Sequence, residues 1–177
     1  MSIVECEIDY LCCRMNIHLQ KATNSDIPLI AEMASKIWKA YYPAIITHEQ
    51  IDYMLDKFYS ASSMQEQMND GQDFYLIQLD HNSVGYLSIT KQNDGEYFLN
   101  KFYIDLDQHR KNIGQTSFQS LLIEIPDMNT IRLTVNRSNF KSINFYFKLG
   151  FIIEEVKDFD IGNNYFMNDF IMIYKRK

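Results

Sequence analysis

The chain has 177 residues, a net charge of −6 and a composition that is 46% hydrophobic and 14% aromatic. This length and composition fit one globular domain with a substantial core, and they exclude a disordered chain. The acidic balance, 17 basic against 23 acidic residues, argues against broad binding of nucleic acid or of an anionic membrane, because phosphate contacts need a basic surface. A run of about 18 apolar residues does not occur, so no membrane-spanning helix is expected. The six glycines leave little material for a glycine-rich nucleotide loop.

Residues 1–14 differ from the rest of the chain, and we expect them to form an N-terminal extension ahead of a functional start at Met15. They begin with acidic rather than basic residues, so a signal peptide is not expected. They also hold the three cysteines, and an odd count without CxxC spacing is typical of reduced thiols in a cytoplasmic protein. The histidines are scattered along the chain, so we expect no metal site.

The first part of the domain reads as one strand followed by three helices. Apolar and polar residues alternate from Met15 to Thr23, which predicts a strand. Capping residues and Pro28 then predict a helix that ends at Pro43. The capping pattern Thr47-His48-Glu49-Gln50 predicts a second helix, and a third is expected to close near Gly71.

The second part has the two-residue periodicity of strands, interrupted by two helices. Strands are predicted at 74–79, 84–89, 96–104, 130–135, 151–156 and 165–174. One helix is expected to follow the polar loop 105–114 and to end at Pro126, and another is expected to run from Asn139 to Gly150. The order β-α-α-α-β-β-β-α-β-α-β-β predicts a single α+β, or mixed α/β, domain.

Two segments suggest chemistry. The loop 105–114 enters a helix, where unpaired backbone N–H groups and the helix dipole favour an anion. Arg110 and Lys111 add positive charge, which suits a pyrophosphate, although an ordinary surface loop remains the alternative. In the second segment, Asn139 caps a helix in which Phe145 and Tyr146 precede Gly150 by about one turn. These aromatic rings could simply pack in the core, but a buried tyrosine hydroxyl needs a partner.

Taken together, the two segments resemble the GNAT (GCN5-related N-acetyltransferase) superfamily over about residues 15–177, including the order of elements. The family's acyl-CoA loop reads Gln/Arg-x-x-Gly-x-Gly/Ala, and the matching residues are His109-Arg110-Lys111-Asn112-Ile113-Gly114. The second family motif reads Asn-x-x-Ala-x-x-Phe-Tyr-x-x-x-Gly-Phe and matches 139–151, with Ser142 in place of alanine. The resemblance implies a mostly antiparallel sheet of about seven strands, splayed between 96–104 and 130–135, with helices on both faces.

The loop departs from the family pattern, because His109 replaces Gln/Arg and Asn112 replaces the first glycine. Backbone N–H groups form such a cradle, and asparagine is the non-glycine residue that best tolerates a positive φ. If position 112 needs that conformation, asparagine should cost about 1 kcal/mol or less relative to glycine. We therefore expect weakened rather than lost binding of CoA.

The resemblance implies acetyl-CoA as cofactor and assigns roles to residues. The strand end Phe102-Tyr103-Ile104 would pair with the pantetheine arm, and an N–H near Ile104 would polarise the thioester carbonyl. Asn139 would hydrogen-bond the cofactor, and Tyr146 would protonate the leaving thiolate. The complete cofactor-binding set is Phe102, Tyr103, Ile104, His109, Arg110, Lys111, Asn112, Ile113, Gly114, Gln115, Asn139 and Tyr146.

The acceptor side is less well defined by the sequence. Some family members carry a glutamate at the position of Phe98, and Glu96, two residues earlier on the same strand face, is a substitute for it or else a solvated residue at the strand start. The first two helices usually line the substrate pocket. That would bring an aromatic and acidic set near a cationic amine, as in polyamine acetyltransferases, and the set consists of Trp38, Tyr41, Tyr42 and Glu49. Trp38 could equally pack in the core.

The sequence thus predicts an acetyl-CoA-dependent N-acetyltransferase that acts on a primary amine of a small molecule by direct attack in a ternary complex. One alternative is a CoA-binding sensor or partner-binding module with little catalysis. Another is an acetyltransferase for peptide N-terminal or side-chain amines. A nucleic-acid or membrane partner is not expected, and a homodimer is compatible with the many aromatic residues.

Overall fold

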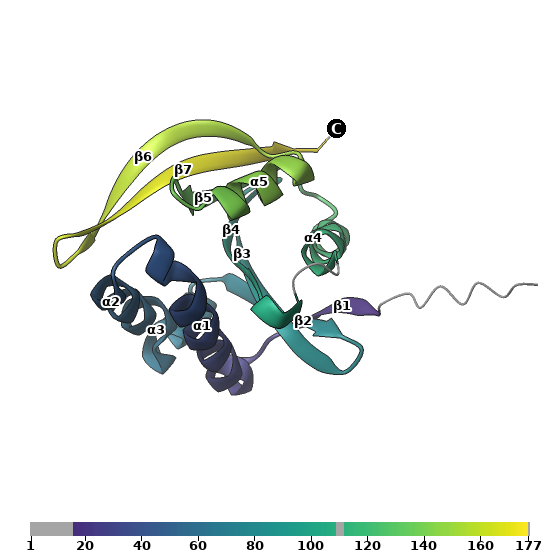
Figure 1. Ribbon diagram of the computed structural model, residues 1–177. Helices are drawn as coiled ribbons and strands as arrows, with labels where there is room; N and C mark the ends of the chain where they lie inside the picture. Colours follow the sequence, from purple (N-terminus) through teal and green to yellow (C-terminus); the bar gives the residue numbers. More distant parts are fainter. Residues whose placement is uncertain (1–15, 109–111, 177) are drawn as a thin grey trace, which may run out of the picture.

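Seven strands form one sheet within residues 16–108 and 112–176, which the computed structural model of the protein describes. The order across the sheet is β1-β2-β3-β4-β5-β7-β6 (Figure 1), and every pair is antiparallel except β4 with β5. The expected mixed fold with a splayed sheet is confirmed. The strands are β1 (Ile17–Lys21), β2 (Gln72–Leu79), β3 (Asn82–Asn93), β4 (Glu96–Ile104), β5 (Thr130–Asn136), β6 (Ile152–Gly162) and β7 (Tyr165–Lys175).

Helices cover both faces of this sheet. The first three pack on one face and the last two on the other, as Figure 1 shows. Residues of β2 serve both cores in alternation: Phe74 and Leu76 face the first group of helices, whereas Tyr75 and Ile77 face the second. The helices are α1 (Ile27–Tyr41), α2 (His48–Tyr59), α3 (Ala61–Asn69), α4 (Ile113–Glu124) and α5 (Phe140–Leu149).

The helix ends follow the expected capping chemistry. Thr47 Oγ1 accepts a hydrogen bond of 3.2 Å from the Gln50 N–H, and Asn139 Oδ1 accepts one of 3.1 Å from the Ser142 N–H. Gly150 adopts φ +99° and ends α5. Local side-chain chemistry therefore fixes where α2 and α5 begin and where α5 ends.

Two strands are longer than the sequence indicated. β3 extends to Asn93 rather than residue 89, and β6 extends to Gly162 rather than residue 156. The added part of β6 carries several charges and is mostly exposed, although Ile161 in it is buried. Its pairing with β7 holds it in the sheet. The expected extension, residues 1–14, lies outside the described residues.

The central feature of the sheet is the short parallel contact between β4 and β5. The two strands pair over three residues, Glu96↔Thr130, Tyr97↔Ile131 and Phe98↔Arg132. β4 then continues to Ile104 along β3, whereas β5 continues to Asn136 along β7. The strands therefore diverge from a common origin, and the edge of β4 beyond Phe98 faces an opening in the sheet.

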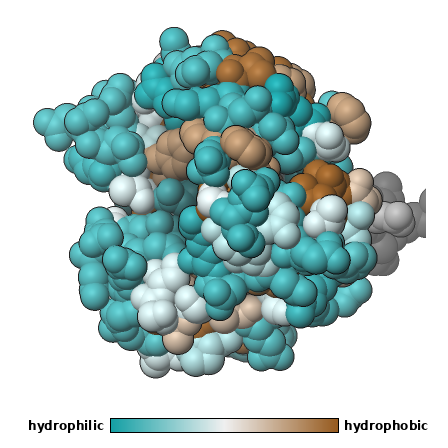
Figure 2. Space-filling view, turned by 90° about the vertical axis from the view of Figure 1, so that its left-hand side faces the viewer, coloured by the Kyte–Doolittle hydropathy of each residue, from teal (hydrophilic) through white to brown (hydrophobic). Residues whose placement is uncertain are grey.

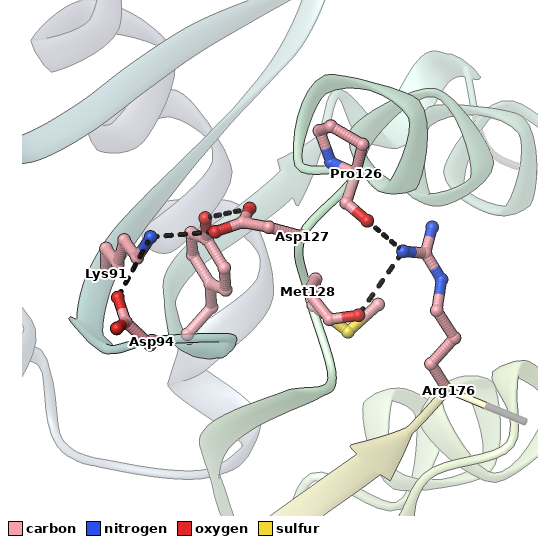
Figure 3. A network of polar contacts seen from close by, with 7 residues as sticks. Lys91, Asp94, Pro126, Asp127, Met128 and Arg176 are labelled. Atoms are coloured by element: carbon pink, nitrogen blue, oxygen red, sulfur yellow. Dashed lines mark hydrogen bonds and ion pairs between the residues drawn. The ribbon is translucent and has the colours of Figure 1, made fainter.

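A network of polar contacts secures the closed end of this splay (Figure 3). The Asp127 carboxylate accepts hydrogen bonds from Tyr97 Oη at 2.6 Å and from Lys91 Nζ at 2.7 Å. The Arg176 guanidinium donates to the carbonyl oxygens of Pro126 and Met128. These contacts join the connection between α4 and β5 to β3, β4 and the end of the chain, so they fix the point from which β4 and β5 separate.

A bulge shapes β4 at the opening. Ser88 of β3 pairs with Lys101, and the next residue, Ile89, pairs with Leu99, so Asn100 has no cross-strand partner in this register. A bulge bends its strand and increases its twist. The bend lies just beyond the last residue that β4 shares with β5, where it helps to turn the two strands apart.

Gly85 provides a test of how closely β3 and β4 pack beside the opening. It lies opposite Ile104, and a Cβ there would meet the Tyr103 carbonyl oxygen and lie 3.1 Å from Ile104 Cα. Both atoms belong to the backbone, so no side-chain rotation relieves the contact. We expect Gly85→Ala to lower the free energy of unfolding in urea by about 1–3 kcal/mol.

Gly71→Ala is the matched control for that substitution. Gly71 has φ +87° and nothing within 4 Å of the added Cβ, so the control carries backbone strain without a clash. We expect its cost to be about 1 kcal/mol. A smaller loss for Gly85→Ala than for this control would contradict the close backbone approach.

Candidate active site

A cavity of about 930 Å³ lies at the opening between β4 and β5. Its lining comes from α1, α2, α3, β2, β4, the start of α4, β5, α5, β7 and the short turns beside them. Figure 2 views the molecule from the side of α2 and the β6–β7 hairpin, and there a recess separates an upper and a lower part of a mainly hydrophilic surface. The volume is that of a typical small-molecule or cofactor site.

At one end of the cavity, α4 begins directly at the lining. Asn112, Gly114 and Gln115 line it, and Asn112 adopts φ +54° immediately before the helix. The left-handed conformation that the sequence argument required at position 112 is therefore present. A Cβ at Gly114 would lie 2.9 Å from the ring of Phe145, so glycine allows α4 to approach α5 closely here. His109, Arg110 and Lys111 lie outside the described residues.

Asn139 links α5 to the tyrosines of α1 and the following turn. Its side chain is buried, and Oδ1 accepts hydrogen bonds from the Ser142 N–H and, at 2.8 Å, from Tyr41 Oη. Burial raises the pKa of Tyr42 to about 12, and hydrogen bonding to Asn139 opposes a small part of this rise. Asn139 thus holds the two sides of the cavity together, a role that the sequence motif did not reveal.

Tyr146 lies on α5 with its side chain buried against aromatic neighbours. Its ring centroid is 5.5 Å from that of Phe145 and 5.5 Å from that of Phe151. Among the described residues its hydroxyl has no hydrogen-bond partner, although the residue lines the cavity. Burial raises the pKa of Tyr146 well above its usual value, so the hydroxyl stays protonated and can donate to a ligand.

Aromatic side chains form a wall along the cavity. Trp38 stacks on Tyr42 with ring centroids 4.5 Å apart, and it meets Tyr59 edge-on at 5.8 Å. The hydroxyls of Tyr42 and Tyr103 lie 3.4 Å apart. Burial raises the pKa of Tyr59 and Tyr103 far above the ordinary value, so the wall is uncharged at neutral pH.

Two buried ionisable side chains line the cavity, and sequence reasoning missed both. Lys101 Nζ donates a 2.5 Å hydrogen bond to Gln67 Oε1 and lies over the rings of Tyr59 and Phe74. Burial lowers its pKa to about 7. A lysine in the middle of a mostly apolar strand was the signal available in the sequence.

The second is Asp169 on β7, whose relative exposure is 5%. Burial raises its pKa to about 6, and nearby Asp158 adds to this, whereas a hydrogen bond from Thr134 and the charge of Arg137 lower it. The sequence predicted a strand at 165–174 without singling out an acid in it. The signal that could have identified Asp169 is an acidic residue among the apolar residues of this strand, because carboxylates are seldom buried without a reason.

The two acids expected at the site are not part of the cavity lining. Glu96 lies at the paired end of β4, where it accepts a 3.0 Å hydrogen bond from Asn93 Nδ2 and lies 3.8 Å from the Arg132 guanidinium. Glu49 is exposed in the first turn of α2, where backbone N–H and Thr47 hydrogen bonds lower its pKa. From that turn it is Gln50 that lines the cavity.

Within the described parts of the chain, no cluster of three or more metal-ligating side chains occurs. None of the helices in residues 16–108 and 112–176 is long and apolar enough to cross a membrane. The cavity presents phenols, the lysine amines of Lys101, Lys141 and Lys148, the carboxylate of Asp169 and a helix N-terminus among its chemical groups.

The sequence model of the acetyltransferase (GNAT) domain matches residues 44–161. An uncharacterized N-acetyltransferase of Mycobacterium tuberculosis is 25% identical over 152 residues, which cover 84% of this chain and 97% of that protein. A spermidine N(1)-acetyltransferase of Thermoplasma acidophilum is 26% identical over 158 residues, which cover 82% and 94%. The crystal structure of a PaiA N-acetyltransferase of Thermoplasma acidophilum in complex with coenzyme A superposes with a TM-score of 0.74 at 24% identity, covering 92% of this chain and 100% of that one.

Proposed function

The chain belongs to the GNAT acetyltransferase domain family and uses acetyl-CoA, and we propose that it transfers the acetyl group to a primary amine of a small molecule by direct attack in a ternary complex. One observation carries this proposal. A single cavity connects the start of α4 to the buried Tyr146 and to the aromatic wall. Both reactants would then meet in the same space, which direct transfer requires.

The residues at the α4 end fit the cofactor. Backbone N–H groups at the start of α4 would hold the pyrophosphate, because the helix dipole favours an anion there. Lys141 and Lys148 of α5 line the same cavity and add positive charge. The edge of β4 at Phe102 and Tyr103, from which β5 has diverged, would pair with the pantetheine arm, and the strand ends at Ile104. Acetyl-CoA supplies an activated thioester.

Tyr146 is proposed to hold the proton that the leaving sulfur takes. Its hydroxyl remains protonated because burial disfavours the phenolate. A phenol can donate as negative charge develops on sulfur. The rings of Phe145 and Phe151 pack against the Tyr146 ring and hold it at the cavity.

The aromatic wall supports a cationic acceptor. Faces of tryptophan and tyrosine attract alkylammonium groups, most strongly when water is excluded. The relative named as a spermidine acetyltransferase supports the same class of acceptor. Trp38 has both a core position and a place in the wall, because its side chain is 4% exposed and also lines the cavity.

The β6–β7 hairpin favours a small molecule over a peptide. Tyr53 and Lys57 of α2 donate hydrogen bonds of 2.7 Å and 2.6 Å to the Ile161 carbonyl oxygen, and Gln50 Nε2 donates one of 3.0 Å to that of Phe166. The hairpin is thereby tied to α2 on the side of the cavity that Phe166 and Met167 line. A peptide chain would have to displace these bonds, whereas a small amine would not.

An assay of acetyl-CoA with different amines tests the function. We expect free CoA to be released with spermidine or other small amines and at least about tenfold more slowly with a peptide N-terminus at equal concentration, a difference of about 1.4 kcal/mol in the barrier. Release with peptides alone would contradict the small-molecule proposal. Binding of CoA without release by any amine would support the sensor alternative.

Tyr146→Phe tests the proposed acid. We expect kcat to fall by about 100-fold or more, because general acid catalysis contributes about 10²–10⁴-fold. The affinity for CoA, measured by calorimetry, should stay within about twofold, a change of about 0.4 kcal/mol. Tyr165→Phe is the control, since Tyr165 does not line the cavity. Unchanged turnover in Tyr146→Phe would rule out the role.

Asn112 tests the cofactor loop. Its φ of +54° is accessible to glycine without strain and is unfavourable for a β-branched residue. We expect Asn112→Gly to bind CoA as tightly as the natural protein or up to about fivefold more tightly, a gain of about 1 kcal/mol or less. Asn112→Val should weaken binding by about tenfold or more, since the strain amounts to about 1–3 kcal/mol. Equal affinity in calorimetry for the glycine and valine variants would contradict the conformational argument.

A further inference from the structure

We propose that Asp169 binds the ammonium group of the acceptor and takes its first proton, an inference that rests on the proposed transfer to an amine. Asp169 lies near the end of β5, opposite Asn136, where the splay is wide. Its side chain is buried and lines the cavity. Within residues 16–108 and 112–176 it is the one acidic residue of the lining.

Asp169, Tyr42 and Tyr146 all line the same cavity. After burial, which is the largest cause in each case, the charge of Asp169 contributes to the raised pKa of Tyr42 and that of Tyr42 contributes to the raised pKa of Tyr146. An amine held at Asp169 would therefore share the cavity with the thioester sulfur that Tyr146 is proposed to protonate.

The surroundings of Asp169 leave its negative charge poorly compensated. Thr134 of β5 hydrogen-bonds to it, and Arg137 beyond β5 and Asp158 of β6 act on its charge. Its charge in turn acts on Tyr42. Lys157 of β6 is its cross-strand partner, and Lys157 Nζ lies 5.3 Å from the centroid of the Phe159 ring. Arg137 Nη2, however, donates a 2.5 Å hydrogen bond to Asp158, so its charge is largely directed there. A buried carboxylate without a dedicated cation gains more from binding an ammonium group than an exposed one does.

Lys101 is separated from this position by the wall. Its Nζ lies 5.4 Å from the centroid of Tyr59, which meets Trp38, which in turn stacks on Tyr42. The positive form of Lys101 repels an ammonium group. The lysines of the lining repel a cationic acceptor, and Asp169, the one acid of the lining among the described residues, attracts it.

The ammonium gives one proton to the Asp169 carboxylate and becomes a neutral amine. The amine nitrogen forms a bond to the acetyl carbonyl carbon, the carbon–sulfur bond breaks, and the sulfur takes a proton from Tyr146. The nitrogen loses its second proton, which restores the Tyr146 hydroxyl, and Asp169 releases its proton to water. The products are the amide, free CoA and one proton.

The test compares Asp169→Asn with Asp160→Asn, which removes the same charge from the neighbouring strand β6. Spermidine is the probe, and its binding to the CoA-loaded protein is measured by calorimetry. We expect Asp169→Asn to weaken spermidine binding by at least tenfold and to lower kcat/KM by at least 100-fold at pH 8, with CoA affinity unchanged within twofold. Asp160→Asn should stay within fivefold of the natural protein in all three measurements, since Asp160 is exposed and does not line the cavity.

Two further readouts distinguish this role from a structural one. Because the pKa of Asp169 is about 6, the rate with the natural protein should fall as the pH drops through about 6, and Asp169→Asn should lack that fall. A carboxyl group with a raised pKa lowers stability once it is ionised, so Asp169→Asn should have a higher melting temperature at pH 8 and lose this advantage toward pH 4. A structural role predicts a lower melting temperature.

Several outcomes overturn the inference. They are unchanged spermidine binding in Asp169→Asn, persistence of the same fall in rate near pH 6, a lower melting temperature at pH 8, or no binding of spermidine by the natural protein. Failure of the proposed function gives a different result: spermidine binds in an Asp169-dependent manner, but no CoA is released with any amine.

Discussion

The parallel contact between β4 and β5 is the constraint on which the rest of the structure depends. It spans three residue pairs, and the strands then follow different neighbours, β3 and β7. Asp127 and Arg176 hold the connection before β5 in place at the closed end (Figure 3). Because that end is fixed, the divergence of the strands produces an opening of defined position instead of a loose sheet edge.

The opening explains why the functional groups come from so many elements. α4 follows β4 and α5 follows β5, so the starts of both helices lie where the two strands have moved apart. α1 and α2 close the opening from the other face, and Asn139 and Tyr41 join the two sides by a 2.8 Å hydrogen bond. Splaying one pair of strands thus brings a helix N-terminus, a buried phenol and an aromatic wall around one cavity.

The sequence predicted the fold well because its elements have local signals. Capping residues such as Thr47 and Asn139, and alternation along β2 and β7, depend on neighbours in the chain. The acids of the site could not be found in this way. Glu96 shares a strand face with Phe98, but pairing with β5 places it at the closed end, and only the register of the sheet decides this. Asp169 could not be identified because the sequence shows only that it lies in a strand, whereas its place in the cavity lining depends on the splay of β4 and β5.

Burial moves the pKa of both Lys101 and Asp169 toward neutrality, the lysine downward to about 7 and the aspartate upward to about 6. Each is therefore less stable in its charged form than it would be in water, and each lowers the stability of the folded protein at neutral pH. An amine acceptor has the opposite difficulty, because its pKa is about 10 and it must lose a proton before attack. A carboxylate that is costly to keep charged accepts that proton more readily than an exposed one. The same burial that destabilises the domain thus favours the transfer of a proton from the acceptor.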